Sequence, residues 1–242
     1  MVKAQISGWR LKQEEQVLFA QAGDLPNWKL ADKTRRMLID FCAHFSDSLP
    51  VLEGVSVEKV EPDIARKWAV VAAAGIVVRS VGSAMALVAC GYLPETGGPV
   101  RRTIEAKLNG LAILEDLTGQ YALRYLQGRP RGLSKLAKKY ESAEDVRLLS
   151  ILAHADARGL ALLSDEPRSI YSHEAGETTV SLVPHREVAQ AHDVLYVMAY
   201  ECGGMCAALA EVFGVAFEIP PWVNGELLRL RDVLKETRVR SR

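Results

Sequence analysis

The sequence predicts an all-α fold, a bundle of five or six helices in which two long apolar helices lie at the centre. Apolar residues recur at steps of three and four along most of the chain, which is the spacing of one helix face. Two stretches of more than twenty residues carry almost no charge, as is typical of helices surrounded by other helices. Strand-like alternation never extends beyond a few residues, and no repeat occurs at the periods of solenoid proteins.

The first helix is predicted over residues 29–49, after a stretch, residues 1–28, that shows no sustained period. Its apolar positions keep helical spacing; they are Leu30, Met37, Leu38, Phe41 and Phe45. Pro50 ends this helix. Pro62 begins the next one, because proline lacks the N–H that would be unpaired in a first turn.

The second helix contains the first long apolar stretch, residues 68–93, whose only charge is Arg79. This stretch is long enough to cross a bilayer, but a membrane position would place Arg79 near the midplane at a cost of about 2.5–3.5 kcal/mol. We therefore favour a central bundle helix, whose many Ala, Gly and Ser residues let neighbours pack closely. No membrane partner is expected.

A third helix is predicted over residues 100–118, and the short Gly- and Pro-containing connection before it indicates a helical hairpin. The following residues 121–140, here called the basic segment, carry six basic residues and no acid and are interrupted by Gly128, Pro130 and Gly132. Three tyrosines are interleaved with these charges, as single-stranded RNA binding would need for stacking; they are Tyr121, Tyr125 and Tyr140.

A capping-box pattern at Ser142 predicts a further helix that ends near residue 163. The last long helix is predicted over residues 185–214, and Glu201 and Glu211 are the only charges in its apolar part. The chain thereby divides into an N-terminal arm, one helical bundle domain and a C-terminal amphipathic tail, which are residues 1–28, 29–219 and 220–242.

The composition limits the function classes. Thirty Lys and Arg residues balance thirty Asp and Glu residues, so only a local patch can attract nucleic acid. Four cysteines in 242 residues do not make a disulfide framework, and the N-terminal residues lack the apolar region of an export signal. We therefore expect a reduced, cytoplasmic protein.

Metal and cofactor chemistry is not expected. No histidine has a glutamate three positions before it, as a bundle di-iron site requires, and the usual nucleotide and hydrolase fingerprints are missing. Cys202 and Cys206 lie one helical turn apart, but no second Cys or His pair at zinc spacing accompanies them. Both cysteines can equally be small buried residues.

The charges within the two apolar helices each need a partner, because an unpaired buried charge costs several kcal/mol. The simplest hypotheses pair Arg79 with Glu105, on the adjacent helix, or with Glu201 on the other apolar helix. Removing the partner carboxylate is expected to cost about 3–5 kcal/mol. The pair then either fixes the helix register or belongs to a polar pocket; both interpretations stay open.

Arginine and histidine at short spacing can act together on a phosphate, with Arg stabilising charge and His exchanging a proton near neutral pH. Three pairs in the chain have such spacing, and spacing alone does not choose among them; they are Arg168 with His173, Arg147 with His154, and Arg186 with His192.

The order of these features resembles the bacterial helical proteins of unknown function grouped near the HEPN superfamily. The resemblance covers about two thirds of the chain, from Asp63 to Gly214. It rests on a long apolar helix with a central Arg, a following Arg-Arg-x-x-Glu motif, a Tyr-Ser-His segment and a closing long helix. The residues concerned are Arg79, Gly91, Arg101, Arg102, Glu105, Tyr171, Ser172 and His173.

The resemblance implies an all-α bundle, a homodimer and, in catalytically active members, metal-independent RNA cleavage within toxin or phage-defence systems. It implies Arg168 and His173 as the catalytic pair, although Ser169 stands where the family often has Asn, Asp or His. The runner-up is a non-catalytic helical protein that binds a partner or a nucleotide. The predicted binding residues are Arg79, Arg101, Arg102, Glu105, Tyr171, Arg124 and Lys138.

Overall fold

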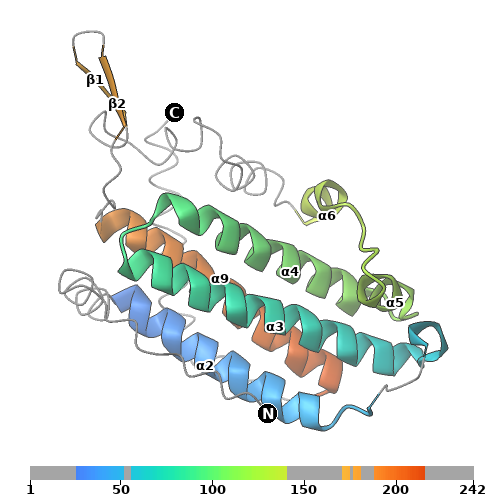
Figure 1. Ribbon diagram of the computed structural model, residues 1–242. Coiled ribbons are helices and arrows are strands. Elements are labelled where there is room, and N and C mark those ends of the chain that lie inside the picture. Colours follow the sequence, from blue (N-terminus) through green and yellow to red (C-terminus); the bar gives the residue numbers. More distant parts are fainter. Residues whose placement is uncertain (1–25, 52–55, 141–170, 175–176, 181–187, 216–242) are drawn as a thin grey trace, which may run out of the picture.

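The computed structural model describes residues 26–51, 56–140, 171–174, 177–180 and 188–215. Apart from one short β hairpin, this part of the protein is a helical bundle with two long apolar helices packed at its centre, which confirms the predicted fold class (Figure 1). The four long helices are α2 (Pro26–Asp47), α3 (Pro62–Ala89), α4 (Gly97–Glu115) and α9 (Val188–Phe213).

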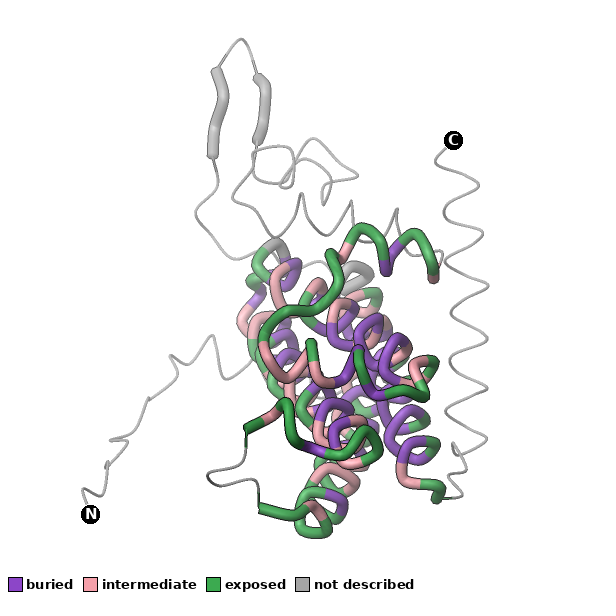
Figure 2. Tube along the Cα trace, turned by 90° about the vertical axis from the view of Figure 1, so that its right-hand side faces the viewer, coloured by how far each residue is buried: buried purple, intermediate pink, exposed green. Residues whose placement is uncertain are grey.

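The two apolar helices α3 and α9 hold the bundle together. Each of them packs against the other and against both α2 and α4. Along these helices buried positions recur between exposed ones (Figure 2). The α3 helix supplies small core residues such as Ala69 and Ala73, whereas α9 supplies larger ones such as Leu195, Met198 and Leu209. Small side chains on α3 bring its neighbours close, and larger ones on α9 fill the space between them.

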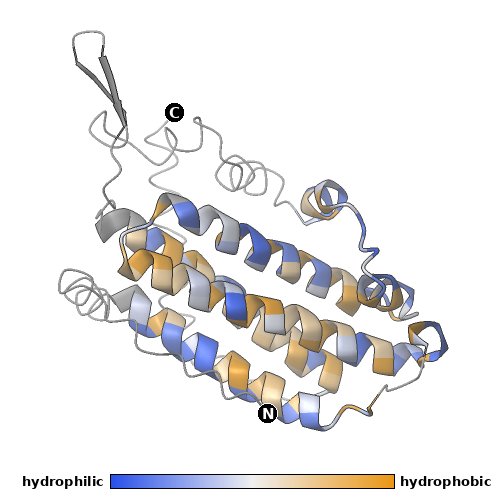
Figure 3. Ribbon diagram, viewed as in Figure 1, coloured by the Kyte–Doolittle hydropathy of each residue, from blue (hydrophilic) through white to orange (hydrophobic). Residues whose placement is uncertain are grey.

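The α3–α4 hairpin forms as predicted. Proline at position 62 begins α3, and Gly91, with φ +78°, follows its end. The Tyr92 N–H then donates to the Leu87 carbonyl at 2.8 Å, as in a helix end closed by a left-handed residue. The short 3₁₀ turn η2 (Pro94–Thr96) leads directly into α4. These two helices therefore lie side by side along their length, and α4 shows more hydrophilic residues on its visible face than α3 (Figure 3).

Both α3 and α9 are long and apolar enough to cross a membrane by length and composition alone. In their most apolar windows, 44% of the α3 residues and 67% of the α9 residues are buried inside the bundle. The packing thus places both helices against other helices, as the sequence predicts for a bundle core, and encloses α9 more fully than α3.

The remaining elements are short. The basic segment contains α5 (Gln120–Leu126) and α6 (Leu133–Lys139), separated where Gly128 takes φ +71°. Two four-residue strands, β1 (Tyr171–Glu174) and β2 (Glu177–Val180), form a hairpin before α9. A 3₁₀ turn, η1 (Val57–Lys59), precedes α3. The helix predicted from Ser142 and the C-terminal tail lie outside the described residues.

Candidate functional site

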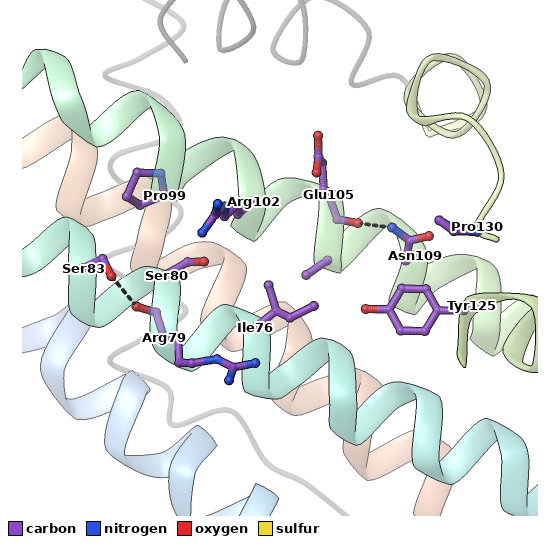
Figure 4. A pocket seen from close by; sticks show the side chains of 11 residues that line it. Ile76, Arg79, Ser80, Ser83, Pro99, Arg102, Glu105, Asn109, Tyr125 and Pro130 are labelled. Atoms are coloured by element: carbon purple, nitrogen blue, oxygen red, sulfur yellow. Dashed lines mark hydrogen bonds between the residues drawn. The ribbon is translucent and has the colours of Figure 1, made fainter. Parts of the chain in front are cut away.

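A groove of about 620 Å³ runs between α3 and α4. On each of these two helices, the residues that line the groove recur at steps of one, three or four, so they lie along one helix face. The α5 helix and the loop after it contribute the remaining lining residues (Figure 4). The lining consists of Ile76, Arg79, Ser80 and Ser83 from α3, Pro99, Arg102, Glu105, Ala106 and Asn109 from α4, Tyr125 from α5, and Pro130.

Arg79 of α3 and Arg102 of α4 both line this groove. Arg79 and Arg102 both have exposed side chains, and neither guanidinium forms an ion pair or hydrogen bond with the described residues. The expectation that Arg79 is buried is therefore wrong. Arg79 lies on the face of α3 that lines the groove, and no other described helix covers this face. The guanidinium therefore stays in contact with water.

The partners predicted for Arg79 are engaged elsewhere. Glu105 accepts a hydrogen bond at 2.9 Å from Arg101, one turn earlier on the same helix. Glu201 is buried and accepts from Lys107 of α4 at 3.1 Å. The prediction that a charge buried in α9 needs an opposite charge is confirmed for Glu201, but its partner is a lysine that was not among the predicted ones.

Two polar groups in the groove add to the arginines. Ser80 is only 5% exposed, and its hydroxyl, which points into the groove in Figure 4, forms no hydrogen bond with the described residues. Tyr125 is half-buried, and its hydroxyl likewise has no hydrogen bond within the described part. Burial raises the pKa of Tyr125, so the hydroxyl stays protonated and can donate.

A hydrogen-bonded network fixes the end of the groove near α5. Asn109 donates from Nδ2 to the Glu105 carbonyl at 2.7 Å and accepts at Oδ1 from the Tyr121 hydroxyl at 2.6 Å. The Tyr121 N–H in turn donates to Asp116. Burial raises the pKa of Asp116, but hydrogen bonds from Thr118 and Tyr121 outweigh it and hold the pKa below its usual value. Asn109 is thus held in one orientation.

The basic segment adjoins this end of the groove, because Tyr125 and Pro130 belong to both. All six of its basic side chains are exposed, including the predicted binding residues Arg124 and Lys138. Arg131 lies over the ring of Tyr121, 5.3 Å from its centroid, and Lys139 pairs with Glu115. Exposed basic side chains therefore lie on α5, on α6 and in the loop between them, beside this end of the groove.

The predicted catalytic pair is not brought together by anything that the structure describes. Arg168 lies outside the described residues, as do Arg147, His154 and Arg186 of the other pairs. His173 and Tyr171 lie on β1, opposite Thr178 and Val180. The remaining member, His192, lies on α9.

The described residues contain no group of three His, Cys, Asp or Glu side chains arranged to hold a metal ion. Cys202 and Cys206 are both buried in the core, and burial raises the pKa of Cys206 to about 12. Burial also raises the pKa of Cys202. Both thiols are therefore protonated at neutral pH, a state that does not favour metal binding.

No family model, no curated protein and no solved structure matches this chain. In its described part, the protein is thus a helical bundle with a groove between α3 and α4 that is lined by two arginines.

Of the residues that line the groove, Arg79, Arg102, Glu105 and Tyr125 were singled out from the sequence, whereas Ser80 and Asn109 were not. A signal for both was present. Asn109 lies seven residues after Arg102, and Ser80 lies next to Arg79. Residues at such spacing share or border one helix face, so a search along the arginine-bearing faces would have found them.

Proposed function

We propose that this protein binds single-stranded RNA, with a backbone phosphate in the groove and the neighbouring nucleotides on the basic segment. The observation that carries the proposal is that Arg79 and Arg102, whose guanidiniums have no partner among the described residues, both line one groove. A guanidinium binds a phosphate through two parallel hydrogen bonds, which makes arginine the preferred residue for such sites. Because the net charge of the chain is zero, an anion is attracted by a local surface, and among the described residues this groove and the basic segment provide one.

The basic segment favours a polymer over a small anion. The segment that adjoins the groove carries six exposed cations, of which Lys139 pairs with Glu115, and this is more than one phosphate would contact. Single-stranded RNA also offers unstacked bases, which aromatic side chains such as Tyr125 can contact.

Cleavage of the bound RNA is a separate part of the proposal, and it rests on the HEPN resemblance alone. In it, Arg168 stabilises the charge on the phosphate and His173 moves the proton, without a metal ion. The alternative is a protein that binds RNA or a nucleotide without cutting it.

Binding is tested by fluorescence anisotropy with a labelled single-stranded RNA at several salt concentrations. We expect the affinity to fall steeply with salt, because bound phosphates release counterions. The double variant Arg79→Gln/Arg102→Gln is expected to weaken binding by about tenfold or more. The control is Arg36→Gln on α2, which removes an exposed arginine away from the groove. Absence of binding by the unaltered protein, or equal weakening by the control, would contradict the proposal.

Cleavage is tested on the same RNA with and without a chelator. Products that persist with chelator and vanish in His173→Ala support the catalytic role, whereas binding without products in any condition supports the alternative.

A further inference from the structure

The two ends of the groove differ in chemistry. Toward one end, the residues that line the groove include Arg79, Ser80 and Arg102. At the other end lie Tyr125, Asn109 and the apolar side chains of Ile76, Ala106 and Pro130. Arg102 and Asn109 are seven residues apart on α4, so the two ends are separated by about 10 Å along the helix. In Figure 4, Arg102 and Ser80 lie on one side of Ile76, and Tyr125 and Asn109 lie on the other.

The end near α5 has the properties of a site for a flat heterocycle. Tyr125 offers an aromatic ring, and Ile76 and Pro130 offer apolar surface. Aromatic rings stack on nucleobases with little dependence on sequence, because every base has a π face.

Asn109 adds a polar edge to this end. Its amide makes two hydrogen bonds within the protein, to the Glu105 carbonyl and from Tyr121. An asparagine amide has two donor hydrogens and two acceptor lone pairs, so one donor and one acceptor remain for a ligand. The hydroxyl of Tyr125, which points toward Ile76 in Figure 4, is a further donor. Such groups read base edges, whereas an apolar pocket alone does not.

We infer that the groove holds one nucleotide unit, with its phosphate between Arg79 and Arg102 and its base against Tyr125 and Asn109. The inference rests on the proposed RNA function and adds to it where the phosphate and the base lie. Tyr121 is a positioning residue in this arrangement, because its hydroxyl orients the Asn109 amide without lining the groove.

The test compares three kinds of ligand by calorimetric titration of the full-length protein. They are inorganic phosphate, ribose 5-phosphate and the nucleoside monophosphates of the four RNA bases. We expect at least one nucleotide to bind about tenfold tighter than ribose 5-phosphate, the gain that stacking of one base supplies. In Tyr125→Leu, the affinity for that nucleotide is expected to fall to the affinity for ribose 5-phosphate. In Tyr125→Phe, most of the gain in affinity over ribose 5-phosphate is expected to remain. The matched control is Tyr92→Leu, which removes an exposed tyrosine outside the groove lining.

The outcomes separate this inference from the proposed function. If RNA binds but no nucleotide exceeds ribose 5-phosphate, the base site is wrong and RNA binding stands. If nucleotides bind with the expected preference but RNA does not, the RNA function is wrong and the nucleotide site stands. If Tyr125→Leu and Tyr92→Leu weaken binding of the preferred nucleotide equally, Tyr125 does not contact the base. If Tyr125→Leu does not fold, the same titrations of the unaltered protein and of Tyr125→Phe still test the inference. Equal affinity for all three kinds of ligand would overturn it.

Tyr121→Phe tests the positioning role. It removes only the hydroxyl that orients Asn109, so we expect a loss of preference among the four nucleotides while the affinity for inorganic phosphate stays unchanged. A uniform loss for all ligands would contradict the role and indicate a structural effect.

Discussion

Glu201 is buried in the middle of α9, with Lys107 of α4 at 3.1 Å from its carboxylate. A carboxylate in this position loses its hydration, and the lysine compensates for that loss. The Lys107 ammonium also lies 4.6 Å from the centroid of the Tyr200 ring, which favours the same position. This pair therefore links α4 to α9 through charge as well as through apolar contact.

Replacing Lys107 with methionine keeps the apolar stem but leaves the buried carboxylate without its lysine. We expect the free energy of unfolding to fall by about 2–3 kcal/mol, below the range for a fully buried pair because the lysine side chain is 21% exposed. Urea denaturation measures this loss. The control Arg101→Met breaks a more exposed pair with Glu105, and its expected cost is less than about 1 kcal/mol. Equal costs for the two variants would contradict a special role for the Lys107 pair.

The Cys206 thiol makes the stability of the fold sensitive to alkali. Its pKa, raised by burial to about 12, lies above the ordinary value of 9.0. Below about pH 9 the thiol is protonated in both the folded and the unfolded chain, so its contribution to stability is complete. As pH rises from about 9 toward about 12, only the unfolded chain ionises, and stability falls.

Between about pH 8 and about pH 10 this thiol is expected to lower the free energy of unfolding by about 1.4 kcal/mol. Urea denaturation at both pH values, compared between the unaltered protein and Cys206→Ala, isolates this contribution from other titrating groups. The expectation is a weaker pH dependence in the variant. An unchanged pH dependence would show that the thiol does not titrate as described.

At the scale of elements, the start of α5 is fixed against the start of α3. Gly119 precedes α5 with φ +70°, and a Cβ atom on it would lie 2.7 Å from Cα of Pro62. Glycine is required at this position for two reasons: its positive φ and the close approach of the Pro62 backbone. This contact sets where Tyr121 and Tyr125 emerge beside the groove.

We expect Gly119→Ala to lower the free energy of unfolding by about 3 kcal/mol, from backbone strain together with the clash. Gly128 offers a matched control, because it has φ +71° but a Cβ atom on it would meet nothing within 4 Å among the described residues. The expected cost of Gly128→Ala is about 1 kcal/mol, from conformation alone. Chemical denaturation of both variants gives the difference, and similar losses would mean that the approach to Pro62 is unimportant.

At the scale of the whole molecule, a homodimer stays a prediction. It rests on the apolar, Gly- and Cys-containing α9 helix and on the resemblance to HEPN-like proteins. Light scattering at micromolar concentration is expected to give twice the chain mass of 26.6 kDa. A mass of one chain under these conditions would contradict it.

The sequence by itself determined the all-α class, the limits of the long helices within a few residues, and the hairpin of α3 with α4. These features follow from local signals: apolar spacing marks each helix, and Pro62 and Gly91 mark the ends of α3. It also grouped Arg79, Arg102 and Glu105, because a short connection makes their helices neighbours.

Only the tertiary structure decided which faces of these helices are covered. The α3 helix is apolar on nearly all sides, so its sequence does not indicate which side meets water, and Arg79 was placed in the core instead of at the groove. The partner of Glu201 is separated from it by 94 residues, and no local spacing signals such a contact. The spacing of Ser80 and Asn109 places them on or beside the arginine-bearing faces, but only the packing of α3 against α4 brings these faces to one groove. Local sequence fixes periodicity and ends, whereas the facing of one helix to another depends on packing among all of them.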